Sequence, residues 1–383
     1  MRLAFEAGAL LVICDMQEAI PLQQIRRTYV RLGGRTLSYF SGCDYFRLAS
    51  HPLVMRAVKE GLTRYGLNVS ASRLTTGNHT IYGELEKQLA GFFRADAALL
   101  TSTGYMTNLV VGQALAGQFS HVLIDSRAHA ALKDASLFLN CPVLSFKHRD
   151  VGSFRETLER CGRRARVVVL TDGMFSHDGS VAPLREYLKA LPRDGLLIVD
   201  DAHGAGVLGA SGGGAVELQG VSRQRVVQCV TLSKALGVYG GAILCARNLR
   251  ERFVLSPAFV GSTPLPLPLA NAGLKALALC RAGESSRARL RKNADFVKEE
   301  LRRAGLSLAD HPGPIVALHF NSKVQIERIK KALLDAKILP PLVRYLGGPV
   351  GGYYRFVISS EHTQGQLKGL IHALKPFVSD ANR

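Results

Sequence analysis

The chain has 383 residues, of which 47% are hydrophobic and 21% charged, and its 49 Lys and Arg against 30 Asp and Glu give a formal net charge of +19. This composition is that of a folded globular protein and excludes a disordered chain. No stretch approaches the roughly 18 consecutive apolar residues of a membrane-spanning helix, so we expect no membrane partner. Seven scattered cysteines without a C-x-x-C pair predict neither disulfides nor a metal site and favour a cytoplasmic location.

The positive charge does not by itself indicate a nucleic-acid-binding protein. Lys and Arg occur in short pairs, as in "IRR", "GRRAR" and "LRRAG", no recognition motif accompanies them, and Trp is absent. Because net charge alone describes solubility and the attraction of anions, we expect an anionic small molecule as partner and no nucleic acid.

The N-terminal segment, residues 1–44, is too short to fold alone. We expect a basic helix followed by "RTLSYF", packed on the C-terminal part of the chain. The apolar stretch "GALLVIC" is short and Asp15 follows it where a signal peptide has small residues, so no signal peptide is expected.

The middle of the chain alternates helical patterns with short apolar runs typical of strands buried on both faces. We therefore predict an α/β fold, with a large, mostly parallel sheet covered by helices on both faces over residues 45–284. Residues 285–383, with weaker strands "IVALHF" and "YRFVIS", predict a smaller α+β domain. The middle of the chain contains five of these short apolar runs, "AALL" at 97, "HVLI" at 121, "VVVL" at 167, "LLIV" at 196 and "VVQCV" at 226.

Polar residues follow every one of these runs. Because the carboxyl ends of parallel strands meet at one edge of a sheet, we expect these residues to share one crevice. In chain order they are "TSTGYMTN", His129, Ser176, Asp200 with His203, and Lys234.

This set of groups is what pyridoxal phosphate (PLP) requires. An amine must form a Schiff base, a carboxylate must pair with the pyridinium nitrogen, and the N-terminus of a helix must hold the phosphate. Lys234, Asp200 and the small-residue loop that ends at Gly104 are candidates for these tasks. Gly237, Gly240 and Gly241 would let the ring approach the backbone.

Several motifs carry a specific resemblance. "SRLTTGNHTIYGELE", "STGYMTN", "SRAHAALKDAS", "TDGMFSHDGSVAPL", "VDDAHGAGVLG" and "TLSKALG" occur in this order. From about residue 40 to the C-terminus the chain resembles the α-oxoamine synthases, a family of fold-type I PLP-dependent transferases.

For the cofactor ring, the resemblance implies that Lys234 is the Schiff-base lysine and the acid/base for the substrate α-proton. Asp200 would pair with the pyridinium nitrogen, His203 and Ser176 would contact the ring hydroxyl, and His129 would stack on the ring.

For the phosphate, the resemblance implies the backbone amides of Gly104 and Tyr105 and the hydroxyl of Thr231. Ser262 or Thr263 would reach the phosphate of the partner subunit in a homodimer with shared active sites.

For the substrate, the resemblance implies that Arg355 binds the α-carboxylate. The chain departs from the family pattern at "CDYFRL", where Cys43 stands in place of a carboxylate-binding asparagine and Arg47 in place of a glycine. In "NVSA", Asn68 and Ser70 replace glycines, which would stiffen a loop near the cofactor.

The family joins an amino acid to an acyl-CoA thioester with loss of carbon dioxide. The motifs favour L-alanine with a pimeloyl thioester, carried by coenzyme A or a carrier protein, as in biotin synthesis. Glycine or serine with another acyl-CoA is the alternative, as in 2-amino-3-ketobutyrate, aminolevulinate, sphingoid-base or secondary metabolism. A non-catalytic basic binding protein on the same fold is an alternative of another class.

Structural roles compete with these assignments. A lysine after a strand commonly points to water, His203 could simply cap a helix, and His129 could be a hydrogen-bonded core histidine. Arg355 could project from the solvent face of its strand. Convergence of the strand ends favours the catalytic interpretation, because groups with perturbed pKa values cluster at active sites.

Overall fold

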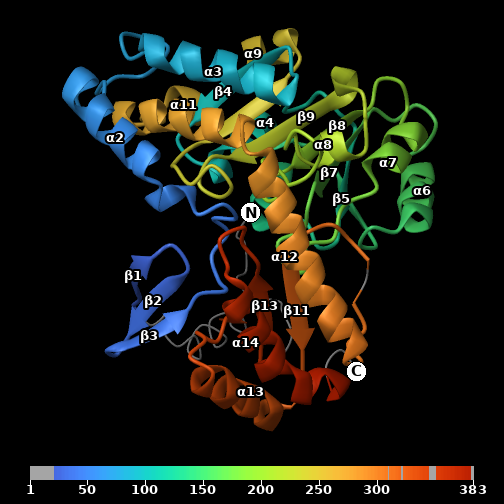
Figure 1. Cartoon of the computed structure of the whole chain (residues 1–383). Helices are drawn as coiled ribbons and strands as arrows, with labels where there is room; N and C mark the ends of the chain where they lie inside the picture. The colour runs from blue at the N-terminus through green and yellow to red at the C-terminus, as the bar shows by residue number, and fades with distance from the viewer. Residues whose placement is uncertain (1–20, 309, 321, 345–350, 381–383) are drawn as a thin grey trace, which may run out of the picture.

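The computed structural model describes residues 21–308, 310–320, 322–344 and 351–380 (Figure 1). The stretch "GALLVIC" lies outside these residues. Among the described residues, no helix is both long and apolar enough to cross a bilayer.

A seven-stranded sheet forms the centre of the larger part, in the order β4-β10-β9-β8-β7-β5-β6. All five apolar runs are strands of this sheet and point the same way, as predicted. Strands β6 and β10 were not expected from the sequence, and β10 runs antiparallel to both of its neighbours. The strands are β4 (Ala97–Thr101), β5 (His121–Asp125), β6 (Val143–Phe146), β7 (Val167–Asp172), β8 (Leu196–Asp200), β9 (Val226–Thr231) and β10 (Gly241–Cys245).

Successive residues of each strand point to opposite faces of this sheet, and both sets are apolar. Helices therefore cover both faces. This confirms the predicted α/β architecture. One face carries α2 (Pro52–Tyr65), α3 (Thr80–Phe93), α6 (Val151–Arg160), α7 (Leu184–Ala190), α8 (Ala215–Leu218) and α11 (Leu267–Arg281). The other carries α4 (Gly104–Ala114), α5 (Ala130–Phe138), α9 (Arg247–Phe253) and α10 (Pro257–Val260).

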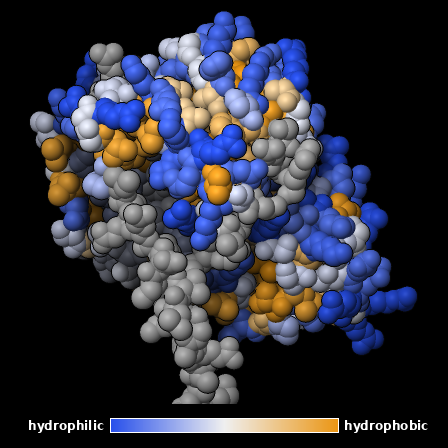
Figure 2. All heavy atoms as spheres, turned by 90° about the horizontal axis from the view of Figure 1, so that it is seen from below, coloured by the Kyte–Doolittle hydropathy of each residue, from blue (hydrophilic) through white to orange (hydrophobic). Residues whose placement is uncertain are grey.

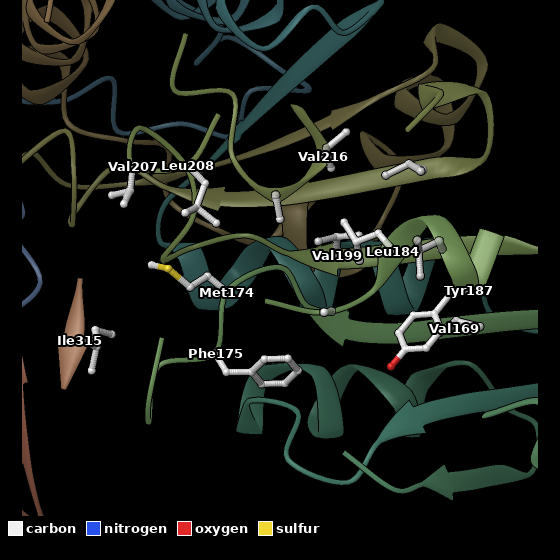
Figure 3. Packing of buried hydrophobic residues seen from close by; sticks show 14 of the residues in the cluster. Val169, Met174, Phe175, Leu184, Tyr187, Val199, Val207, Leu208, Val216 and Ile315 are labelled. Carbon is white, nitrogen blue, oxygen red and sulfur yellow. The ribbon is translucent and has the colours of Figure 1, made fainter. Parts of the chain in front are cut away.

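The core under α6, α7 and α8 extends to the segment that carries Ser176. Figure 3 shows Met174 and Phe175, which follow β7, among buried residues of the same cluster as Tyr187. Ile315, from a strand of the C-terminal part, joins this cluster. Burial of Met174 and Phe175 therefore fixes the chain next to Ser176.

The C-terminal part has its own three-stranded sheet, in the order β11-β13-β12, and its own core. Helix α12 begins at Glu284, beside the boundary that we place at 285, and runs from the large sheet toward this smaller one (Figure 1). The elements are α12 (Glu284–Arg303), β11 (Ile315–His319), α13 (Lys323–Asp335), β12 (Leu342–Val343), β13 (Tyr353–Val357), α14 (Gln364–Leu374) and the 3-10 turn η4 (Lys375–Asp380). Two further 3-10 turns are η2 (Leu48–Ser50) and η3 (Arg223–Arg225).

The described part of the N-terminal segment, residues 21–44, contains strands instead of the expected basic helix, and residues 1–20 lie outside the described structure. Residues 23–38 form an antiparallel meander of β1 (Gln23–Arg26), β2 (Tyr29–Leu32) and β3 (Arg35–Ser38). Gly33 and Gly34, with φ of +51° and +78°, make the β2–β3 turn, a left-handed geometry that interrupts any helix. The meander lies against the C-terminal part, because the Ser38 amide donates to the carbonyl oxygen of Lys337 at 2.8 Å.

The face of the molecule seen in Figure 2 is largely hydrophilic, with separate apolar groups between polar ones. This pattern fits the high proportion of Lys and Arg in the chain.

Candidate active site

Lys234 lies at the carboxyl edge of the sheet, three residues after β9. Its Nζ is 2.7 Å from Nε2 of His203, which follows β8. The other ring nitrogen, Nδ1 of His203, is 2.8 Å from the hydroxyl of Tyr45. Tyr45 is fully buried and His203 is 5% exposed, so the three polar groups form a chain inside the protein.

Burial disfavours charge on the members of this chain. It lowers the pKa of His203 well below its usual range, and the neighbouring charges of Lys234 and Arg355 lower it further. Burial also lowers the pKa of Lys234, although nearby Cys43 and Asp200 act in the opposite direction. A neutral amine is the nucleophilic form of lysine, so this environment prepares Lys234 to react with a carbonyl carbon.

Asp200 ends β8 and is held by two hydrogen bonds. Oδ2 accepts from Nδ2 of Asn108 at 2.7 Å and Oδ1 accepts from the Ala202 amide at 3.1 Å. Asp172 is the residue opposite Asp200 in the parallel β7–β8 pair. Burial, followed by repulsion from Asp200, raises the pKa of Asp172 well above its usual range.

His129 lies at the start of α5, after β5. Its amide donates to Oδ2 of Asp172 at 2.9 Å, and its Nδ1 accepts from the Ala131 amide at 3.2 Å. The ring of Tyr105 lies edge-on to the imidazole, with centroids 6.5 Å apart. Burial lowers the pKa of His129, while Asp200 acts against this effect. The imidazole therefore caps α5, and it also lies close enough to Asp200 and Lys234 for their charges to influence its pKa.

The N-terminus of α4 forms a cradle for an anion. The helix begins at Gly104, so its first amides, including that of Tyr105, have no partner within the helix. A Cβ on Gly104 would lie 2.6 Å from Cβ of Thr231, which is too close for any residue other than glycine. The hydroxyls of Thr231 and Ser233 lie 2.7 Å apart on the facing loop. Amide donors, hydroxyls and a positive helix end together suit a phosphate.

The smaller sheet contributes Arg355, on β13. Its Nη1 donates to the carbonyl oxygen of Ser176 at 3.2 Å, and its charge influences the pKa of Lys234. Arg355 thus faces the segment after β7 rather than projecting from the solvent face of its strand. Cys43 is partly buried and lies near enough to Lys234 to influence the same pKa.

Ser262 and Thr263 lie in the loop before α11. They line a pocket with Thr101, Ser102 and Met106, next to the start of α4. The Ser262 hydroxyl donates to the Ala258 carbonyl oxygen at 2.5 Å.

Three residues of the site were not assigned from the sequence. Asn108 stands four residues after Gly104 on α4, inside "STGYMTN". This spacing places the two residues on the same side of the helix, so it could have indicated that Asn108 faces the same sheet edge. Asp172 lies two residues after the "VVVL" run, and this position also points to the same edge. Tyr45 reaches His203 from 158 residues away, and nothing in the local sequence marks it.

The glycines near Lys234 serve the protein chain rather than the cofactor ring. A Cβ on Gly237 would lie 2.3 Å from the Ala49 amide, and one on Gly241 would lie 2.5 Å from the Thr103 carbonyl oxygen. Gly240 has φ +114° and approaches Leu265. The expectation that these glycines admit the ring is therefore wrong for Gly237 and Gly241, where protein atoms fill the space.

Two of the residues that replace glycines adopt glycine-like backbone geometry. Arg47 has φ +53° and Ser70 has φ +50°, in the left-handed region that disfavours side chains. The Arg47 guanidinium donates to the Tyr39 carbonyl oxygen at 3.1 Å, and the Ser70 amide donates to Oδ1 of Asn68 at 2.5 Å. These hydrogen bonds thus stabilise Arg47 and Ser70 in the left-handed conformation.

The residues present fit pyridoxal phosphate. A partly buried amine, a buried carboxylate and a helix N-terminus whose first amides have no partner within the helix lie at one sheet edge. Gly104 lets Thr231 lie against the start of this helix, and the paired hydroxyls of Thr231 and Ser233 suit the phosphate. These are the three anchor points that the cofactor needs, so fold and site define a PLP-dependent enzyme of fold type I.

Comparisons with known proteins agree with this class. Residues 43–374 match the family model for aminotransferase class I and II, so the chain belongs to this family. It is 36% identical to the 8-amino-7-oxononanoate synthase of Thioalkalivibrio sulfidiphilus, over 89% of this chain and 88% of that protein. The synthase of Methylococcus capsulatus is also 36% identical, over 92% of each chain.

Solved structures narrow the class to the α-oxoamine synthases. A serine palmitoyltransferase variant from S. paucimobilis, with bound PLP and myriocin, has a TM-score of 0.88 at 25% identity, covering 96% of this chain and 94% of that one. The 8-amino-7-oxononanoate synthase of Francisella tularensis has a TM-score of 0.77 at 25% identity, covering 88% and 97%. The chain is a PLP-dependent α-oxoamine synthase, an acyltransferase that forms an aminoketone.

Proposed function

We propose that the chain condenses L-alanine with a pimeloyl thioester to give 8-amino-7-oxononanoate, carbon dioxide and the free thiol of the carrier. The new carbon–carbon bond joins the alanine α-carbon to the thioester carbonyl carbon, and the carboxylate leaves as carbon dioxide. The observation that carries this proposal is the Lys234–His203–Asp200 constellation in a chain 36% identical to synthases of this name.

When bound, pyridoxal phosphate supplies an aldehyde that bonds to amines and a ring that withdraws electrons from the substrate α-carbon. Lys234 Nζ would hold the aldehyde carbon and, once released, take the α-proton. Its lowered pKa favours the neutral form that both tasks need. Asp200, oriented by Asn108, would pair with the ring nitrogen.

His203 and Tyr45 would fix the position of the Lys234 amine through the buried hydrogen-bond chain. His203 and Ser176 would contact the ring hydroxyl, and His129 would cover one face of the ring. The role of Ser176 is supported by its place beside Arg355.

The amides of Gly104 and Tyr105 and the hydroxyl of Thr231 would bind the phosphate at the start of α4. Arg355 would bind the amino-acid carboxylate, with Cys43 near it. Ser262 and Thr263 would reach the phosphate of a second subunit in a cytoplasmic homodimer.

A second candidate is an α-oxoamine synthase that uses serine or glycine with another acyl-CoA. The serine palmitoyltransferase structure matches with a higher TM-score than the Francisella tularensis synthase, 0.88 against 0.77. Arg47 and Ser70 depart from the family pattern near the site, which also favours a separate test of substrate choice.

The test is a matrix of three amino acids and four thioesters. PLP-loaded enzyme is incubated with alanine, glycine or serine and with acetyl-, succinyl-, pimeloyl- or palmitoyl-CoA, and the products are identified by mass. The proposal expects the alanine–pimeloyl product to form fastest. Preference for serine and palmitoyl-CoA would replace it with the second candidate, and no product above that of Lys234→Ala in any pair would support a non-catalytic protein.

A further inference from the structure

Two histidines and an aspartate come together beside the active site, on the segments that follow β6 and β7. One nitrogen of His148, one of His177 and a carboxylate oxygen of Asp178 lie within 4.8 Å of one another. None of the three has a part in the proposed reaction. They are imidazole and carboxylate groups, the ligands that divalent transition metals take in proteins.

A buried carboxylate orients His148 within this cluster. Oδ1 of Asp125, at the end of β5, lies 2.9 Å from Nδ1 of His148, and Asp125 is fully buried. Because an ionised carboxylate only accepts, Nδ1 carries the proton and Nε2 presents a lone pair. This Nε2 is buried and has no hydrogen-bond partner in the described structure. Metal-binding histidines typically donate their second nitrogen to a carboxylate in this way.

His177 presents a second lone pair. Its Nε2 lies 3.1 Å from Nη1 of Arg127, which can only donate, so Nε2 is the acceptor. The same Nε2 lies 3.3 Å from Oδ2 of Asp178. In the tautomer that accepts from Arg127, two electron-rich atoms face each other; a protonated Nε2 would instead donate to Asp178 and would lose this proton when a metal ion binds. Arg127 is exposed and free to move aside for a metal ion.

We propose that His148, His177 and Asp178 form a binding site for one divalent transition-metal cation of the Zn²⁺, Co²⁺ or Ni²⁺ type. The side chains are 17%, 19% and 31% exposed, so the ion can enter from solvent and keep water at its remaining positions. The bound ion ties the segment after β6 to the segment after β7 that carries Ser176. The spacing of the cysteines led us to expect no metal site. A site built from histidines and an aspartate leaves no signal in that spacing, so it was not predicted.

The test is cobalt binding to tag-free, PLP-loaded enzyme after treatment with a chelator. Co²⁺ is added and the bound metal is counted by elemental analysis, with the visible absorption of protein-bound Co²⁺ as a second signal. The proposal expects one Co²⁺ per chain in the wild type, at least tenfold weaker binding in His148→Ala and His177→Ala, and unchanged binding in His372→Ala, which removes an exposed histidine of α14. The melting temperature should rise by a few degrees with metal in the wild type and His372→Ala alone.

Arg127→Ala and Asp178→Asn decide the result if a histidine variant does not fold. Arg127→Ala removes the competing cation and should bind Co²⁺ several-fold more tightly than the wild type, whereas Asp178→Asn should bind more weakly. Cofactor absorbance and the melting temperature report folding in each variant. The proposal is overturned if the wild type binds no Co²⁺ at millimolar concentration, or if Arg127→Ala and Asp178→Asn bind as the wild type does.

Discussion

Two lysines with lowered pKa values lie in two different regions of the described residues, and their partners differ. At the edge of the large sheet, Lys234 is partly buried and its Nζ faces the His203 imidazole, with Asp200 and Arg355 close enough to influence its pKa. In the C-terminal part, Lys298 of α12 is 2% exposed, and its Nζ donates to the carbonyl oxygens of His311 and Gly313 at 2.8 and 2.5 Å.

Burial lowers the pKa of both amines, that of Lys298 to about 8. A lowered pKa therefore does not distinguish a reactive lysine from a structural one. The partners do, because backbone carbonyls hold Lys298 as a donor, whereas a neutral imidazole leaves the Lys234 amine able to bond elsewhere. Changes at Lys234 should affect chemistry, and changes at Lys298 should affect stability.

The largest expected effect is that of Lys234→Ala. Loss of the nucleophile and of the proton acceptor should lower kcat by about 10³-fold or more, since acid–base catalysis alone contributes roughly 10²–10⁴-fold. Turnover is measured as release of free thiol from the acyl-CoA. Lys87→Ala, which removes an exposed lysine of α3, should keep wild-type turnover, and comparable turnover in the two variants would refute the role of Lys234.

Asp200→Asn should lower kcat by about 10²–10³-fold, the usual effect of removing one preorganised electrostatic partner. The neighbouring Asp201 is the matched control, because it accepts from the Ala215 amide and the Gln228 side chain instead. Asp201→Asn should lower the melting temperature and retain cofactor absorbance near that of the wild type. Equal turnover in the two variants would contradict the assignment of the ring partner to Asp200.

Lys298→Met should destabilise the fold and leave the chemistry intact. It removes the donor of two buried carbonyl groups, each worth about 1–3 kcal/mol when unsatisfied, so the free energy of unfolding should fall by about 2–4 kcal/mol. Two such groups together give an upper limit of about 6 kcal/mol for this loss. Urea unfolding measures it, with Lys292→Met, at an exposed position of α12, as the control. A loss of kcat in Lys298→Met without a loss of stability would show that the two lysines do not differ as described.

The same lysine predicts a pH dependence of stability. The pKa of Lys298 is about 8 in the folded chain and about 10.4 in an unfolded one. Between these values the unfolded state binds more protons, so stability rises with pH. The free energy of unfolding of the wild type, relative to Lys298→Met, should increase by about 2 kcal/mol from about pH 8 to about pH 9.5. A flat or falling difference would mean that Lys298 stays charged over this range.

Arg355→Lys should have the smallest effect. Lysine keeps the charge but loses the forked pair of donors that matches a carboxylate. KM for the amino acid should rise about tenfold with little change in kcat. Arg291→Lys, at an exposed position of α12, should change neither constant. An unchanged KM in Arg355→Lys would remove Arg355 from the substrate site.

The sequence predicted the large sheet and the edge at which Lys234, Asp200 and His203 lie, for a physical reason. Parallel strands buried on both faces leave a continuous apolar run, and polar residues that follow such runs lie at one sheet edge. Lys234, Asp200 and His203 were found in this way. Tyr45 was missed because its contact with His203 depends on tertiary packing between segments far apart in the chain.

The terminal regions were harder to predict. Residues 23–32 contain basic residues that suggest a helix, yet they form strands because the following glycine turn and the contact with Lys337 favour a meander. Lys298 lies in a basic helix without any local sign of burial. Its environment depends on the backbone around His311 and Gly313, which sequence spacing does not reveal.

The most direct test of the central claim identifies the lysine that holds the cofactor. The PLP-loaded enzyme is reduced with sodium borohydride and digested, and the peptides are examined by mass spectrometry. The account predicts a pyridoxyl phosphate group on the peptide that contains Lys234, and none on any peptide of Lys234→Ala. A modified Lys298 or another lysine, with an unmodified Lys234 in the wild type, would contradict it.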